Sequence, residues 1–134
     1  MKMSGPARFI NLDVVLKSNS DQGSLVRHLD QDKRVIVLSH HESEGQFVLV
    51  FELSFAGPEP NPRSCTQQLL AIIDQFPDAM LELWKSCISR TFDYGFEGGY
   101  NNPALETTIP ADLLMQIGRI GADIGITVYP YRTD

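Results

Sequence analysis

Residues 34–55 read RVIVLSHHESEGQFVLVFELSF. β-Branched and aromatic side chains fill both halves of this stretch, and they predict one strand over Arg34–His41 and a second over Gln46–Phe55. The intervening residues Glu42–Gly45 have the length of a hairpin loop and end in a glycine, which tolerates the positive φ of tight turns. We therefore expect two antiparallel strands joined by residues 42–45.

The register of this hairpin separates two faces. With residues 42–45 as the loop, His41 lies opposite Gln46, and alternate side chains share a face. We expect helices to cover the strongly apolar face, which holds Ile36, Leu38, His40, Phe47, Leu49 and Phe51. The opposite face is too apolar for plain solvent-exposed surface, so we expect a second subunit to cover its valines, Val35, Val37, Val48 and Val50. The sequence thus predicts a homodimer.

Outward from the hairpin, the same kinds of pattern predict three further strands with helices between them. The strands are expected at Arg8–Lys17, Thr91–Tyr100 and Ile124–Tyr129. Apolar residues at helical spacing predict a short helix ending near Asp30, a helix opening at Ser64 with a capping box to Gln67, a further helical stripe after Pro77 up to Cys87, and a last helix from Pro110 to Gly121.

The resulting order, β-α-β-β-α-β-α-β, predicts an α+β fold. We expect a five-stranded, mostly antiparallel sheet with the helices on one face. The first six elements match the ferredoxin-like βαββαβ arrangement, to which a helix and a strand are added. A length of 134 residues fits one domain, residues 1–134.

Charge and composition exclude several classes of function. The formal net charge is −6, and residues 35–134 hold five of the eleven Lys and Arg but thirteen of the seventeen Asp and Glu. Such a surface repels nucleic acid. No apolar run is long enough to span a membrane, and the N-terminus MKMSGPARF has no secretory pattern. With only two cysteines, Cys65 and Cys87, we expect reduced thiols and a cytoplasmic location.

Candidate binding residues follow from the open face of the sheet, the face that the helices leave uncovered. This face holds Glu52 of the hairpin, and if the apolar rows of all strands point inward it gains Asn11, Asp13, Val15, Asp93, Glu97, Thr127 and Tyr129. The candidate binding residues among them are Asn11, Asp13, Asp93, Glu97 and Tyr129. Asp93 and Glu97 lie four residues apart on one strand, roughly 13 Å, which is too far for a glycosidase pair. His40 and His41 point to opposite faces and do not predict a metal site, and no motif predicts a cofactor. Binding is therefore favoured over catalysis.

Two segments, PADLLMQIGRIGADIGITVYP at residues 110–130 and TFDYGFEGG at residues 91–99, resemble a pattern found in small uncharacterised bacterial α+β domains. The matching features are structural: a helix starting at Pro, a Gly stop and a final strand. Some of those domains are suspected to be immunity proteins, which neutralise a toxin from neighbouring cells. The resemblance implies a bacterial source and this fold, and it brings no catalytic residue.

Two functions remain open. The first is a non-enzymatic interaction module, in one version an immunity-type protein, that binds a basic protein partner through its acidic surface. The second is a small-ligand-binding protein or an enzyme that uses the acidic residues Asp13, Asp93 and Glu97 together with Tyr129 on the open face. The sequence does not identify the partner, the ligand or the strand order.

Overall fold

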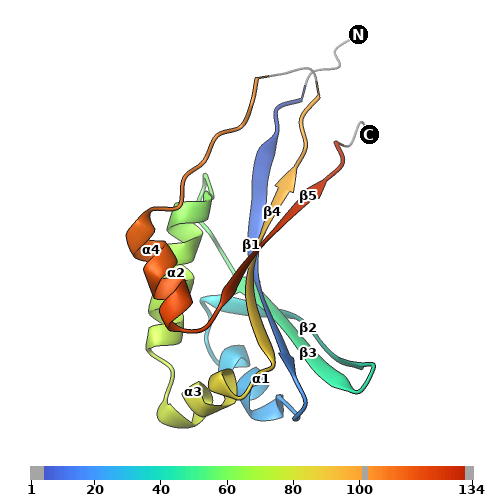
Figure 1. Ribbon diagram of the computed structural model, residues 1–134, viewed down its shortest axis with the longest axis vertical. Coiled ribbons are helices and arrows are strands. Elements are labelled where there is room, and N and C mark those ends of the chain that lie inside the picture. Colours follow the sequence, from blue (N-terminus) through green and yellow to red (C-terminus); the bar gives the residue numbers. More distant parts are fainter. Residues whose placement is uncertain (1–4, 101–102, 132–134) are drawn as a thin grey trace.

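The computed structural model describes residues 5–100 and 103–131 and has the predicted α+β fold (Figure 1). The strands follow the order β2-β3-β1-β4-β5 across one mixed sheet. The elements along the chain are β1 (Arg8–Ser18), α1 (Gly23–Asp30), β2 (Val35–Ser43), β3 (Gln46–Leu53), α2 (Pro62–Asp74), α3 (Asp78–Lys85), β4 (Ser89–Glu97), α4 (Ala111–Arg119) and β5 (Asp123–Tyr129).

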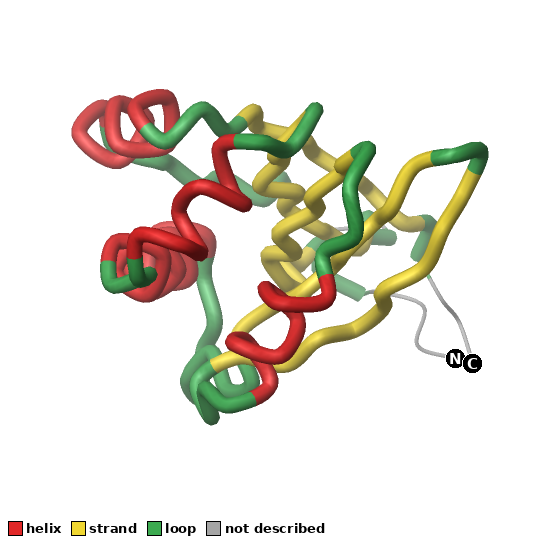
Figure 2. The backbone as a smooth tube through the Cα atoms, turned by 90° about the horizontal axis from the view of Figure 1, so that it is seen from below, coloured by secondary structure: helices red, strands yellow, loops and turns green. Residues whose placement is uncertain are grey.

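Strand β1 lies at the centre of the sheet and runs antiparallel to both of its neighbours, β3 and β4. Strand β2 pairs antiparallel with β3, whereas β5 pairs parallel with β4. A parallel connection needs a long crossover, and helix α4 lies in that crossover between β4 and β5. The tube view in Figure 2 shows how strongly the sheet twists along these pairings.

The core lies between the sheet and the helices. Alternate residues of β1, Leu12, Val14 and Leu16, are buried, and they pair with buried residues of β3 and β4. Helix α2 contacts β1 and β3, α1 contacts β2, and α4 contacts α2. The Trp84 indole donates a hydrogen bond to the Ile120 carbonyl oxygen at 2.8 Å, which ties α3 to the end of α4.

Helix boundaries depart from the predictions at one point. The side chain of Asn61, not Ser64, caps α2: Asn61 Oδ1 accepts a hydrogen bond from the Ser64 backbone N–H at 2.9 Å. The helix therefore begins at Pro62, a residue suited to the first turn because it needs no hydrogen-bond partner for an N–H. The predicted break at Pro77 separates α2 from α3, and Gly121 adopts a φ of 74° after α4.

The hairpin register differs from the predicted one. The turn is two residues long, with Glu44 at φ 54° and Gly45 at φ 81°, and Ser43 pairs with Gln46. Two positive φ values are typical of the type I′ turn that joins twisted strands. Further along the hairpin the register shifts between Val37 and Ser39, so Leu38 is the extra residue of a β-bulge.

This bulge corrects the predicted dimer face. Beyond Leu38 the side chains change sides, so Val37 pairs with Phe51 and packs against the core, and Val35 is only 6% exposed. Ile36, predicted to be covered, is instead 49% exposed. Val48 and Val50 are half-buried on the opposite side of β3. The four valines thus do not share a face.

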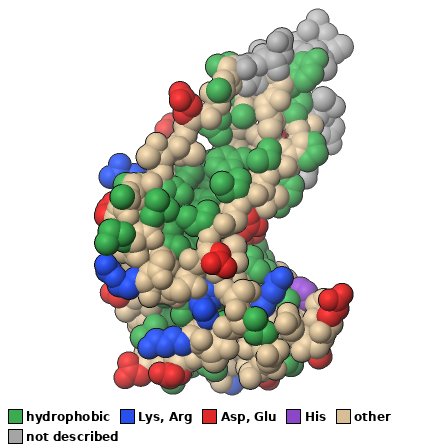
Figure 3. Space-filling view, in the orientation of Figure 1, with side chains coloured by type: hydrophobic (Ala, Val, Ile, Leu, Met, Phe, Trp, Pro, Cys, Tyr) green, Lys and Arg blue, Asp and Glu red, His purple; other side chains and the backbone are tan. Residues whose placement is uncertain are grey.

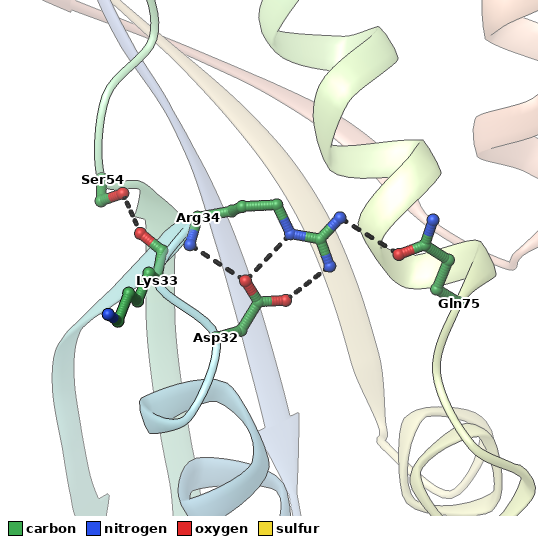
Figure 4. Close-up of polar contacts among 5 residues, drawn as sticks. All are labelled: Asp32, Lys33, Arg34, Ser54 and Gln75. Atoms are coloured by element: carbon green, nitrogen blue, oxygen red, sulfur yellow. Dashed lines mark hydrogen bonds and ion pairs between the residues drawn. The ribbon is translucent and has the colours of Figure 1, made fainter.

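Figure 4 shows the contacts that fix the segment leading into β2. The Asp32 carboxylate accepts hydrogen bonds from the backbone N–H, Nε and Nη2 of Arg34, and Arg34 Nη1 donates to Gln75 Oε1 at 3.1 Å. These bonds lower the pKa of Asp32 to about 2. The Ser54 hydroxyl donates to the Lys33 carbonyl oxygen, so residues 32–34 connect α1, β3 and the end of α2.

Candidate functional site

Three carboxylates lie together on the side of the sheet opposite the buried residues Leu12, Val14 and Leu16, the face predicted to be open. We call Asp13, Glu52 and Asp93 the acidic cluster. They come from three adjacent strands: Asp13 on β1 is the direct cross-strand partner of Asp93 on β4, and Glu52 lies on β3. The Asn11 amide nitrogen donates to Asp13 Oδ1 at 3.1 Å and to Glu52 Oε2 at 3.0 Å. Asn11 thus holds the first two carboxylates close to each other.

The third carboxylate has a different neutral partner. The Thr127 hydroxyl, on β5, donates to the two oxygens of Asp93 at 2.9 and 3.2 Å. Within residues 5–100 and 103–131 the ion pairs are Arg8–Glu97 and Arg34–Asp32, so no Lys or Arg there pairs with the acidic cluster. The cluster therefore depends on an amide and a hydroxyl to stabilise its charge.

The electrostatic consequence falls on Asp13. Partial burial, a hydrogen bond with Glu52 and the nearby charges of Glu52 and Asp93 raise the pKa of Asp13 to about 7. Each of these causes disfavours the ionised form. Near neutral pH Asp13 is therefore only partly ionised, and a cation placed against the cluster would favour its ionised form.

Two glycines make room for these contacts. A Cβ at Gly95, the cross-strand partner of Asn11, would lie 2.5 Å from Asn11 Oδ1. A Cβ at Gly125, the partner of Asp93, would lie 3.1 Å from Thr91 Cγ2 and 3.4 Å from Asp93 Oδ1. Because glycine has no side chain, Gly95 and Gly125 leave room for the side chains of Asn11 and Asp93.

We expect Gly95→Ala to displace the Asn11 side chain and disconnect Asp13 from Glu52. Losing the two bonds that Asn11 donates to carboxylates would cost about 2–4 kcal/mol of unfolding free energy. Chemical denaturation measures this cost. Gly118→Ala is the matched control, since nothing lies within 4 Å of a Cβ there. An equal loss in both variants would contradict the role given to Gly95.

An open hollow of about 410 Å³ lies beside the cluster and is lined by Arg8, Ile10, Asn11, Glu97 and Tyr129. Arg8 Nε donates to Glu97 Oε1 at 2.9 Å, and the Glu97 side chain is only 13% exposed. The register of β1 against β4 shifts between Phe9 and Asn11. This irregularity brings the apolar residue Ile10 to the hollow.

The five predicted binding residues thus occupy two adjoining places. Asn11, Glu97 and Tyr129 line the hollow, and Asp13 and Asp93 belong to the acidic cluster. Sequence reasoning placed Glu52 on this face but did not include it among the binding residues. The same holds for Thr127, whereas Arg8 and Ile10 were not predicted to lie at a binding site.

The histidines lie apart from this site, with His40 paired with Leu49 and His41 with Val48 on the hairpin. Among the described residues no group of three His, Cys, Asp or Glu is placed to hold a metal ion. No helix in that part of the chain is long and apolar enough to cross a membrane. No protein-family model, curated protein or solved structure matches this chain.

Proposed function

We propose that this protein is a non-enzymatic interaction module whose open face binds a basic protein partner. The observation that carries the proposal is the acidic cluster: three carboxylates on adjacent strands, stabilised by Asn11 and Thr127, with no Lys or Arg of the described chain in an ion pair with them. A partner's Arg or Lys would donate charge-assisted hydrogen bonds there, and these are stronger than neutral ones.

The overall negative charge also supports a basic partner. With thirteen of seventeen acidic side chains in residues 35–134, the long-range field attracts a basic protein and speeds its association. A cytoplasmic immunity-type protein that neutralises a basic, nuclease-type toxin is the version of this proposal that fits the resemblance of residues 91–99 and 110–130. In that version Asp93 and Glu97 contribute to the contact.

We also propose that the β1–β4 part follows the ferredoxin-like arrangement, with the helices on one face. The order β2-β3-β1-β4, antiparallel throughout, supports it, as does the place of α1 after β1 and of α2 and α3 after β3. In this arrangement the helices leave the opposite face of the sheet, with the acidic cluster, open to a partner.

The first test uses a hexa-arginine peptide as the probe in an NMR titration of the full chain. We expect the largest amide shifts around Asp13, Glu52 and Asp93, and a rise of roughly tenfold in the dissociation constant for the Asp93→Asn, Glu97→Gln double variant. The matched control, Asp74→Asn with Glu82→Gln, removes the same charge from exposed positions on α2 and α3. Equal weakening in both variants would show that only net charge matters.

A small ligand is the second candidate, and the hollow favours it, because Arg8, Glu97 and Tyr129 offer a cation, an anion and a phenol in about 410 Å³. A thermal-shift screen of small polar compounds distinguishes this candidate from the first. A true ligand would raise the melting temperature of the wild type and lose that effect in Tyr129→Ala. The same variant would leave hexa-arginine binding at the cluster nearly unchanged.

A further inference from the structure

Strand β5 forms one edge of the sheet and carries an apolar row that no helix or strand of residues 5–100 and 103–131 covers. Ile124, Ile126 and Val128 are the cross-strand partners of Phe92, Tyr94 and Phe96 on β4. Phe92 and Tyr94 are buried, and Phe96 packs against the core, yet the β5 residues are 41%, 69% and 64% exposed. The apolar side chains of β4 are therefore covered, whereas the apolar side chains next to them on β5 are exposed.

The position of helix α4 explains the exposure. It packs mainly on α2, and its buried residues are Leu113 and Ile117. Its neighbouring residues Leu114 and Met115 are also exposed. Figure 3 shows hydrophobic side chains gathered in the hollow between α4 and β5.

The backbone of β5 points the N–H and C=O groups of the same three residues away from β4. The Tyr129 carbonyl oxygen accepts a hydrogen bond from the Gly98 N–H at 2.8 Å, so Tyr129 faces β4. Along a strand the direction of the N–H and C=O groups alternates, and residues 123, 125 and 127 therefore face β4 as well. Ile124, Ile126 and Val128 direct their N–H and C=O groups to the free edge. Such an edge is commonly protected by Lys, Pro or a β-bulge. Residues 124–129 contain no Lys or Pro, and they pair with β4 without the register shift of a bulge.

We propose that β5 pairs antiparallel with β5 of a second copy of this chain, about a two-fold axis at Ile126. Ile126 then lies opposite its own copy, and Ile124 lies opposite Val128. In an antiparallel ladder such opposite residues with outward backbone groups exchange both N–H···O=C bonds. One pairing thus satisfies the free backbone groups and covers the apolar row at once.

The pattern of charge explains why a second copy fits this edge. The one charged residue of β5 is Asp123, and in this register it faces Tyr129 of the other copy, so no like charges meet across the strand pair despite the net charge of −6. Three aliphatic side chains per copy remove roughly 200–300 Å² of apolar surface when covered. Together with one seven-residue strand this makes a small interface, so we expect a dissociation constant in the micromolar range.

Sedimentation velocity across a concentration series tests the dimer with matched variants on the two edges of the sheet. Ile126→Lys should weaken dimerisation at least about 100-fold, because the change occurs twice in one symmetric interface. Ile36→Lys is the control, since it makes the same substitution at an exposed isoleucine of the other edge strand, β2. Both side chains are about half exposed or more, so melting temperatures should stay near the wild-type value.

Amide hydrogen exchange separates strand pairing from side-chain packing alone. In the dimer the amides of Ile124, Ile126 and Val128 should be protected, and in Ile126→Lys they should exchange at least about tenfold faster. The amides of Gly125 and Thr127, which face β4, should stay protected in both. A chain that is monomeric at all concentrations, a dimer lost in Ile36→Lys instead, or a dimer without this alternate protection would each overturn the proposal.

Discussion

Replacing Val35 by Asn is expected to lower the free energy of unfolding by about 3 kcal/mol, or roughly 10 °C in melting temperature. Val35 is 6% exposed and belongs to the core, so the new amide would lose solvent without gaining a partner. The lost apolar burial adds to that cost. Thermal and urea unfolding monitored by circular dichroism measure the effect.

The neighbouring substitution is the control. Ile36 pairs with Glu52 and is 49% exposed, so Ile36→Asn should cost less than about 1 kcal/mol. In a hairpin without the bulge at Leu38 the order of the two effects would reverse. Equal or reversed costs would therefore show that the register of β2 differs from the one described.

The hairpin shows how far sequence patterns reach. The strands and their antiparallel pairing were predictable because β-branched and aromatic residues flank a short polar segment ending in Gly45. The faces of β2 were not, because Val35, Ile36, Val37 and Leu38 are all apolar and contain no alternation that marks a side. One extra residue exchanges the two faces, and tertiary packing alone decides where it lies.

The candidate site shows the same limit at another strand. Alternation along β1 and β4 placed Asn11, Asp13, Asp93 and Glu97 on one face, since polar residues there interrupt buried ones. It could not show which strands are adjacent, and the proximity of Asp13 to Asp93 depends on the pairing of β1 with β4. The irregularity at Ile10 in β1 was also not predictable, because Phe9 and Ile10 are both apolar and show no alternation that marks a side.

The alternation of apolar residues predicted strand β5, but it did not predict that the apolar row of this strand is exposed. Its pattern of Ile124, Ile126 and Val128 is typical of a strand with one covered face, and the prediction supposed that this apolar row points inward. In the structure α4 packs mainly on α2. Helical periodicity shows which residues of a helix are buried, but not which element buries them.

We expect Asp13→Asn to stabilise the protein at pH 8 by about 1–2 kcal/mol and to change little at pH 4. Asp13 has a pKa of about 7 in the folded chain and 3.8 as its ordinary value. Between these values the folded state holds a proton that the unfolded state has released, so wild-type stability falls as pH rises from about 4 to 7. The magnitude allows for solvent screening of a half-buried group.

Urea unfolding of both proteins from pH 4 to pH 8 measures this difference. The variant cannot ionise at residue 13, so its stability should lose less over that range. Asp74→Asn, which removes an exposed carboxylate from α2, is the matched control and should follow the wild-type curve. Parallel curves for wild type and Asp13→Asn would contradict the raised pKa.

The same group makes binding depend on pH in a direction that the proposed function fixes. A cationic side chain on the acidic cluster favours ionised Asp13, so binding of hexa-arginine should release protons and tighten several-fold from pH 6 to pH 8. In Asp13→Asn that dependence should largely disappear, because residue 13 no longer ionises. A ligand that instead needs protonated Asp13 as a hydrogen-bond donor would bind more weakly as pH rises. Titrations at the two pH values therefore separate a basic partner from a neutral ligand that accepts the Asp13 proton.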